Sequence, residues 1–199
     1  MKKMFFIAGI LCLGVSTKVS AQLSKGNILV GTDVANFRLG LEKDAGFDIL
    51  LLPKAGWFVS NNLAIGAYLK LGVSKENEEA PTTTIYGVGP LVRYYMNRGD
   101  LNLLKHGRWY GEATVGIEGR NQSKGGGTTN GLGIGVGPGY AYFITPNIGL
   151  ETLLKWNPLI GFGDEGFQSN LSLNFGFQIY LPGKATVNKI TTEEGGAPK

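Results

Sequence analysis

The chain has little of the chemistry that enzymes and metal sites use. Its 199 residues include one cysteine, Cys12, and one histidine, His106. Structural zinc sites take several ligands from these two residue types, and a disulfide needs two cysteines, so neither is expected. A lone histidine in a polar connection is also weak support for acid–base catalysis. The sequence therefore predicts no catalytic residues, no metal and no cofactor.

Charge is scarce as well, and it is not clustered. Charged residues make up 17% of the chain, whereas soluble domains average about a quarter. The formal net charge is +4, but three of the lysines, Lys2, Lys3 and Lys18, belong to an N-terminal leader. No basic stripe of the kind that follows a phosphate backbone remains, which excludes nucleic acid as an expected partner.

No apolar run reaches the roughly 20 residues that a membrane-spanning helix needs. The apolar stretch 4–15 is shorter, follows Lys2 and Lys3, and precedes the small residues Val19, Ser20 and Ala21. This pattern is typical of a secretory signal peptide over 1–21, cleaved near Ala21. We expect one domain over 22–181, followed by a polar periplasmic tail over 182–199.

What the chain has instead is alternation with a period of two. In 169–181, large apolar side chains alternate with small or polar ones: Leu171, Leu173, Phe175, Phe177, Ile179 and Leu181 lie between Ser172, Asn174, Gly176, Gln178 and Tyr180. Successive side chains of a strand point to opposite faces of the sheet, so this segment is predicted to be a strand with two unlike faces.

The same alternation occurs eight times. The expected strands are 27–36, 47–59, 63–74, 83–97, 108–119, 131–144, 148–158 and 169–181. Their length suits tilted membrane-spanning strands. Tight turns near Asn61 and Pro146 mark one end, and polar or glycine-rich loops mark the other. The predicted fold is all-β: an eight-stranded antiparallel up-and-down transmembrane barrel with its short turns in the periplasm.

The orientation of the two faces decides between a membrane barrel and a soluble one. A soluble barrel would have to enclose Trp109, Trp156, Phe175 and Phe177 with many Leu and Ile residues, yet eight strands leave room only for side chains or one small ligand. Its outside would be a glycine-rich wall with few charges. We therefore expect the apolar face to meet lipid and the glycine-rich face to line a narrow lumen.

Charged residues on the inward face are nearly balanced. Five acids, Asp48 among them, face four bases. The expected lumen charge network consists of Asp33, Lys54, Lys70, Arg93, Glu112, Glu118, Glu151 and Lys155. Counting residues from each turn places Arg93, Glu112 and Glu151 in one layer, and Lys70, Lys155 and Glu118 in a higher one. Because an unpaired charge in a narrow lumen is costly, we expect paired plugs at both levels.

Aromatic pairs recur at a fixed spacing after Pro53, Pro90 and Pro138. The residues expected at the lipid–water interface are Trp57, Phe58, Tyr94, Tyr95, Tyr142, Phe143 and Tyr180. Proline removes one ladder hydrogen bond, so we expect local bulges at the three prolines. Phe37 and Leu39 break phase with Val34, which fits either a bulge or a strand extended beyond the bilayer.

Taken together, the leader, the eight strands, the Asn-containing turns and the aromatic strand ends resemble the small outer-membrane β-barrels of the OmpA/OmpX type, especially Bacteroidetes-like members. The resemblance implies a monomer in the outer membrane of a Gram-negative bacterium, in contact with lipids and lipopolysaccharide. It also implies insertion by the barrel assembly machinery, guided by a terminal aromatic signal to which Phe175, Phe177 and Tyr180 are similar.

The expected role follows from this class. A plugged barrel would contribute to envelope integrity or present its loops to surface partners whose identity the sequence leaves open. The alternative is a narrow, porin-like channel or a carrier for small or apolar solutes. Outer-membrane enzymes that modify lipid A use a histidine near the outer leaflet, whereas His106 is expected in a periplasmic turn, so we expect no enzyme.

Overall fold

A computed structural model describes residues 23–40, 45–77, 79–96, 107–123, 125, 127–162 and 166–183. They form eight strands: β1 (Ile28–Leu39), β2 (Ala45–Ser60), β3 (Leu63–Asn77), β4 (Thr83–Tyr95), β5 (Gly107–Gln122), β6 (Thr128–Thr145), β7 (Ile148–Gly161) and β8 (Phe167–Leu181). The expected leader over 1–21, His106 and all but the first two residues of the expected tail lie outside the described residues. Within the described ranges, no helix is long and apolar enough to cross a membrane.

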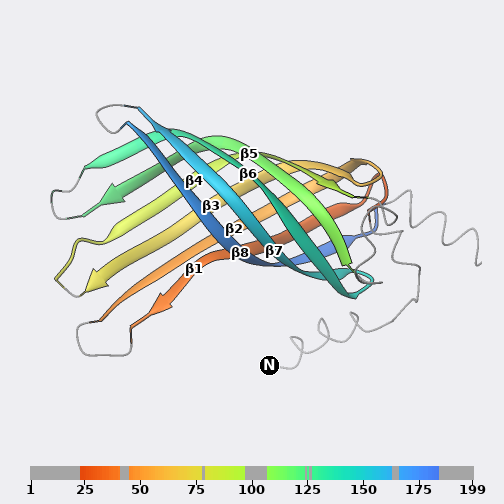
Figure 1. Cartoon of the computed structure of the whole chain (residues 1–199), viewed down its shortest axis with the longest axis horizontal. Coiled ribbons are helices and arrows are strands. Elements are labelled where there is room, and N and C mark those ends of the chain that lie inside the picture. Colours follow the sequence, from red (N-terminus) through yellow and green to blue (C-terminus); the bar gives the residue numbers. More distant parts are fainter. Residues whose placement is uncertain are drawn as a thin grey trace, which may run out of the picture.

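The strands close into a barrel in which each strand pairs with its sequence neighbours, and β1 pairs with β8 (Figure 1). All pairings are antiparallel. The predicted eight-stranded up-and-down barrel is confirmed. We call the end with the two short connections, 61–62 and 146–147, the turn end and the opposite end the loop end. Most strands extend further toward the loop end than the alternation alone indicated.

One connection at the turn end shows why its residues suit a tight turn. Asn62 has a φ of 68°, the left-handed region that asparagine tolerates better than most residues. Its amide nitrogen donates to the carbonyl of Leu23, and its carbonyl accepts from Tyr95. The turn between β2 and β3 is therefore tied to the segment before β1 and to the end of β4.

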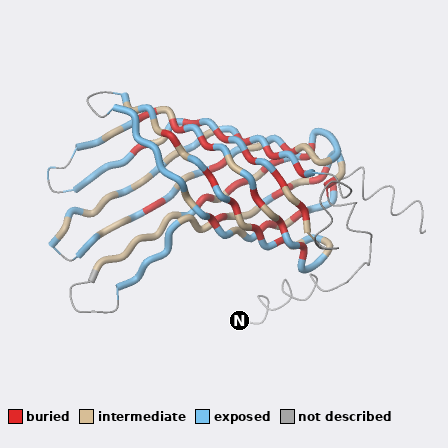
Figure 2. The backbone as a smooth tube through the Cα atoms, viewed as in Figure 1, coloured by how far each residue is buried: buried red, intermediate tan, exposed pale blue. Residues whose placement is uncertain are grey.

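Side chains alternate between the two faces of the wall as the sequence predicted. On β8, Leu171 and Phe175 are 66% and 60% exposed, whereas Asn174 and Gln178 are 1% and 0% exposed. Buried positions are concentrated toward the turn end (Figure 2). The barrel therefore has an apolar outer surface and a lumen that is tightly filled in its turn-end half.

The three in-strand prolines do not produce the expected bulges. Between β2 and β3, the register passes from Leu51↔Leu71 to Lys54↔Tyr68 without a shift, although Pro53 lies between. Pro90 and Pro138 likewise leave gaps in one ladder while the register continues. A missing N–H thus interrupts the ladder on one side only, and the strand pairs normally with its other neighbour. The bulge prediction at these residues was wrong.

A bulge does occur in β1, where the phase of the sequence breaks. The register with β2 shifts between Val34 and Asn36, and the strand then continues to Leu39. The bulge alternative for Phe37 and Leu39 is therefore confirmed, and the strand continues beyond the bulge. The bulge keeps Phe37 and Leu39 on the outer surface, where they are 71% and 60% exposed.

Beyond this bulge, the barrel wall is split. The pairing of β1 with β8 runs from Ile28↔Leu181 to Val34↔Phe175 and ends there. Residues 167–174 of β8 pair only with β7, and residues 36–39 of β1 pair only with β2. The loop-end halves of β1 and β8 diverge in Figure 1. The wall between β1 and β8 is thus open over its loop-end half.

Candidate functional site: the barrel lumen

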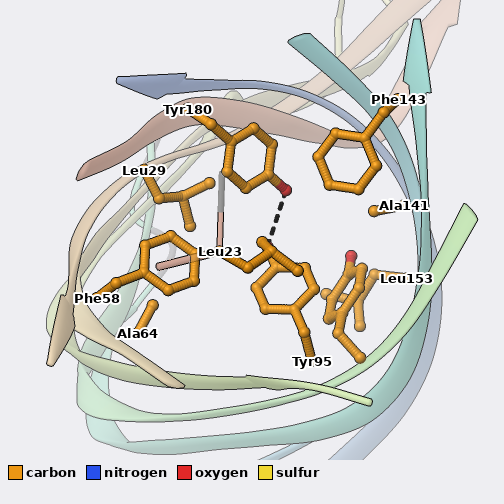
Figure 3. Close-up of a cluster of buried hydrophobic side chains, with 10 residues drawn as sticks. Leu23, Leu29, Phe58, Ala64, Tyr95, Ala141, Phe143, Leu153 and Tyr180 are labelled. Atoms are coloured by element: carbon orange, nitrogen blue, oxygen red, sulfur yellow. Dashed lines mark hydrogen bonds between the residues drawn. The ribbon is translucent and has the colours of Figure 1, made fainter. Parts of the chain in front are cut away.

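The turn-end half of the lumen is filled by a cluster of apolar and aromatic side chains. This turn-end cluster consists of Leu23, Leu29, Phe58, Ala64, Tyr95, Tyr110, Ala141, Phe143, Leu153 and Tyr180. In Figure 3 these side chains converge from opposite walls toward the barrel axis. The Tyr180 ring lies 5.1 Å from that of Phe143 and 6.3 Å from that of Tyr95. These side chains therefore pack against one another across the bore at this end.

Four members of this cluster were assigned to the lipid–water interface from the sequence, and that assignment was wrong. Phe58, Tyr95, Phe143 and Tyr180 are at most 3% exposed and point into the lumen. Neighbouring residues of a strand face opposite sides, so both members of an aromatic pair cannot meet lipid. The outward members, listed here with their exposure, are Trp57 (57%), Tyr94 (49%) and Tyr142 (42%).

A network of charges lies next to the cluster, with Glu112 of β5 at its centre. Arg93 Nη2 donates to Glu112 Oε2 over 2.6 Å, and Lys54 Nζ donates to the same oxygen over 3.0 Å. Lys155 Nζ donates to Glu112 Oε1 over 3.1 Å. The Glu112 side chain is 1% exposed. One carboxylate therefore joins cations from β2, β4 and β7 across the bore.

The two other acids of the network hold the remaining donors. Arg93 Nη1 donates to Glu151 Oε2 over 2.7 Å, and Lys54 Nζ donates to Asp33 Oδ2 over 2.6 Å. Because Asp33, Glu112 and Glu151 oppose Lys54, Arg93 and Lys155, the formal charges of these six side chains cancel. Buried charges are tolerable only in such paired and hydrogen-bonded arrangements.

Tyrosine hydroxyls connect the charges to the turn-end cluster. Tyr180 donates to Glu151 Oε1 over 2.6 Å, and its oxygen lies 2.8 Å from that of Tyr95. Arg93 Nη1 donates to the Tyr95 hydroxyl over 3.0 Å, and the Arg93 guanidinium carbon lies 4.2 Å from the centre of the Tyr110 ring. The two layers are therefore joined in one continuous hydrogen-bonded network.

A second ion pair lies nearer the loop end. Lys70 Nζ donates to Glu118 Oε2 over 2.5 Å, and the Tyr68 hydroxyl donates to Glu118 Oε1 over 2.9 Å. The sequence placed Lys155 in this layer, but Lys155 binds Glu112 instead. Counting residues from each turn ignores the stagger between neighbouring strands of a tilted barrel, and that stagger decides which charges meet.

Glycines make room for these long side chains. An added Cβ at Gly133 would overlap the Glu118 carboxylate, and one at Gly135 would overlap the end of Lys155. An added Cβ at Gly176 would overlap the Asp33 carboxylate. The glycine-rich face of β6 is thus the surface against which charged side chains from the neighbouring strands lie.

Several lumen residues escaped the sequence reasoning. Tyr68 and Gln178 belong to the inward set of their strands, and Gln178 Nε2 donates to Asp33 Oδ1 over 2.9 Å. Arg108 is 9% exposed near the turn end and donates to the carbonyl of Gly107. Alternation alone marks all three as inward-facing. Tyr68 and Gln178 were missed because they are neutral and only charged residues were assigned to layers. Arg108 was missed because it lies at the very start of its strand.

The three residues compared with an assembly signal do not share one face. Phe175 and Phe177 are 60% and 43% exposed on the outer surface, whereas Tyr180 lies in the lumen.

Asp48 lies apart from the charge network, near the loop end, where its Oδ2 accepts from Asn36 at 3.4 Å. Within the described part of the chain, no group of three or more His, Cys, Asp or Glu residues could hold a metal ion.

Comparison with known proteins identifies the fold but no family. No family model matches the chain, and no curated protein matches it. The solved structure of Neisserial surface protein A superposes with a TM-score of 0.52 at 20% identity, covering 77% of this chain and 95% of that one. The N-terminal β-barrel domain of Pseudomonas aeruginosa OprF gives 0.48 at 12% identity, covering 79% and 98%. The chain has the fold of the small eight-stranded outer-membrane barrels.

Proposed function

We propose that this chain is an integral outer-membrane barrel whose lumen is plugged by charge pairs, with a role in envelope integrity or surface interaction and no enzymatic activity. The observation that carries the proposal is the buried network around Glu112, in which Arg93 is 0% exposed. Ions would have to pass both this network and the turn-end cluster. Opening such a path would break several charge-assisted bonds at once.

The outer surface supports a membrane location. On β8 the outward positions from Leu171 to Leu181 are all apolar, and exposed Phe167 follows beyond the polar Ser169. At about 2.5 Å of height per tilted residue this band is roughly 25 Å tall, the thickness of the apolar belt of outer-membrane barrels. Trp57 and Trp156 are 57% and 47% exposed near its two edges. In this orientation the turn end faces the periplasm and the loop end faces outward.

Conductance tests the plug. The protein reconstituted in planar bilayers is expected to give little or no steady current. Glu112→Ala combined with Tyr95→Ala and Tyr180→Ala removes the shared acceptor of three cations and truncates two rings of the turn-end cluster. This variant is expected to give measurable conductance, whereas Ala113→Ser, at the neighbouring outward position, leaves the bilayer silent. Steady current through the unaltered protein would contradict the plug, and so would a triple variant that is folded but silent.

The split between β1 and β8 favours a second candidate, a carrier that passes apolar solutes sideways into the bilayer. Exposed Phe37 and Leu39 border the split on β1, and Leu171 and Leu173 border it on β8. The inner side of this edge is polar, since Asn157 Nδ2 donates to Ser172 Oγ over 2.9 Å. An apolar solute could leave the loop-end lumen here without crossing the plug.

A disulfide across the split tests this candidate. The expected mature chain has no cysteine, so Phe37→Cys with Leu173→Cys introduces the only pair. Continuing the register beyond Val34↔Phe175, with one bulge residue, would place these positions opposite each other. Oxidation should be slow while the split is open, because a disulfide needs Cα atoms within about 7 Å. The oxidised form should lose uptake of an apolar dye into vesicles, whereas unchanged uptake would eliminate the lateral route.

A further inference from the structure

A cavity opens in the lumen at the loop end, beyond the Lys70–Glu118 pair. Its volume is about 310 Å³. The lining residues come from β1 to β5 and from the connection between β3 and β4: Asn36, Asp48, Ser74, Glu76, Ala80, Pro81, Thr83, Ile85, Arg120 and Gln122. Ligand sites start at about 300 Å³, so this cavity is large enough for a small molecule only.

The strand register places the polar lining side by side. Asp48 pairs with Ser74, Ser74 with Thr83, and Thr83 with Gln122, which sets four polar residues in one row across β2 to β5. Arg120 pairs with Ile85 one step closer to the plug. The row and the step below it therefore form a continuous polar wall built on strands.

In the described part of the chain, the charges of this wall differ from those of the plug in forming no ion pairs. Among the described residues, no ion pair or hydrogen bond engages the side chains of Glu76 or Arg120, and Asp48 has only the 3.4 Å contact with Asn36. In the plug, by contrast, Arg93 alone makes four hydrogen bonds. The lumen thus pairs its charges around Glu112 and leaves one cation and two acids open around the cavity.

We propose that this cavity binds a small zwitterion, an amino acid or short peptide with a free ammonium and a free carboxylate. Arg120 presents the planar fork of donors that matches a carboxylate. Asp48 and Glu76 supply two acceptors for an ammonium, and Ser74, Thr83 and Gln122 add hydrogen bonds to a peptide unit. The volume favours an amino acid or a dipeptide over longer chains. The site is separate from the plug and does not depend on whether the plug conducts.

Calorimetric titration of the protein in lipid nanodiscs tests the assignment. The probes are alanine, alanyl-alanine, and two blocked dipeptides, N-acetyl-alanyl-alanine and alanyl-alanine amide. A fifth probe, O-phosphoethanolamine, carries an ammonium with a phosphate, as lipid headgroups do. We expect the free dipeptide to bind at least tenfold more tightly than either blocked form, because each block removes one of the two charge-assisted contacts.

Variants separate the two ends of the ligand. Arg120→Gln should weaken the free dipeptide about tenfold and abolish its preference over the amide, while the preference over the acetylated form remains. Asp48→Asn with Glu76→Gln should do the reverse. Lys75→Gln is the matched control, because Lys75 lies between Ser74 and Glu76 on β3 but belongs to the outward set of that strand and does not line the cavity. Heat-modifiable migration on a detergent gel verifies that every variant is folded.

Four outcomes would overturn the proposal. One is that the blocked dipeptides bind as tightly as the free one. Another is that neither alanine nor the free dipeptide binds at about 10 mM. Arg120→Gln could behave like the control variant. Tighter binding of O-phosphoethanolamine than of both alanine and the dipeptide would assign the cavity to a headgroup-like ligand instead.

Discussion

Arg93 and Glu112 are paired across β4 and β5, and their side chains meet over 2.6 Å with no more than 1% of either exposed. Arg93 also reaches across the bore to Glu151. The guanidinium of β4 therefore joins the adjacent strand β5 to β7, which lies three strands away around the barrel. This geometry makes Arg93 the residue on which the charge network most depends.

Arg93→Ala is expected to lower the free energy of unfolding by about 3 to 5 kcal/mol, because it leaves Glu151 without a basic partner in a buried site. The measurement is the unfolding temperature in detergent, monitored by the shift from the folded to the unfolded band on a gel. Val92→Ala, at the neighbouring outward position, removes apolar surface without touching the network and should cost less. Equal losses in both variants would show that the ion pairs add nothing beyond packing.

The sequence was sufficient for the barrel because two faces of unlike polarity repeat along every strand, as in Leu171 to Leu181. It was also sufficient to name the charges that meet in the lumen. It failed where an answer depended on the stagger of strands, as for Lys155, or where a pair of like residues hid the alternation, as for Phe58 and Tyr95. The split beside Phe37 depends on how far two strands stay paired, and no local pattern encodes that.

Gly89→Ala should destabilise the barrel by about 1 to 3 kcal/mol, because an added Cβ would overlap the backbone carbonyl of Val115, which cannot move away without disturbing the ladder. Gly111→Ala is the matched control: nothing lies within 4 Å of a Cβ placed there. Its effect should stay within about 0.5 kcal/mol. Urea unfolding of both variants in detergent measures the difference, and similar midpoints would contradict close strand contact at Gly89.

Tyr180→Phe tests the corrected position of the aromatic residues. The change keeps the ring but removes the hydroxyl that donates to Glu151 over 2.6 Å. We expect a loss of about 1.5 to 3 kcal/mol, the usual range for a hydrogen bond to a charged group. Tyr94→Phe, whose ring is 49% exposed on the outer surface, should have little effect on unfolding. The opposite order would place Tyr180 at the lipid surface and Tyr94 in the lumen.

Tryptophan fluorescence tests the proposed membrane-spanning band directly. Trp57 and Trp156 are both exposed, and the register places Trp57 beside Ile28 near the turn end and Trp156 beside Leu171, at the loop-end limit of the uninterrupted apolar run on β8. In variants that retain one tryptophan, lipids brominated near the headgroup should quench each residue more strongly than lipids brominated near the chain ends, because rings of this kind lie at the interface. A soluble barrel would expose the same surface to water, so emission from both residues that is insensitive to brominated lipids would contradict a membrane-spanning band between them.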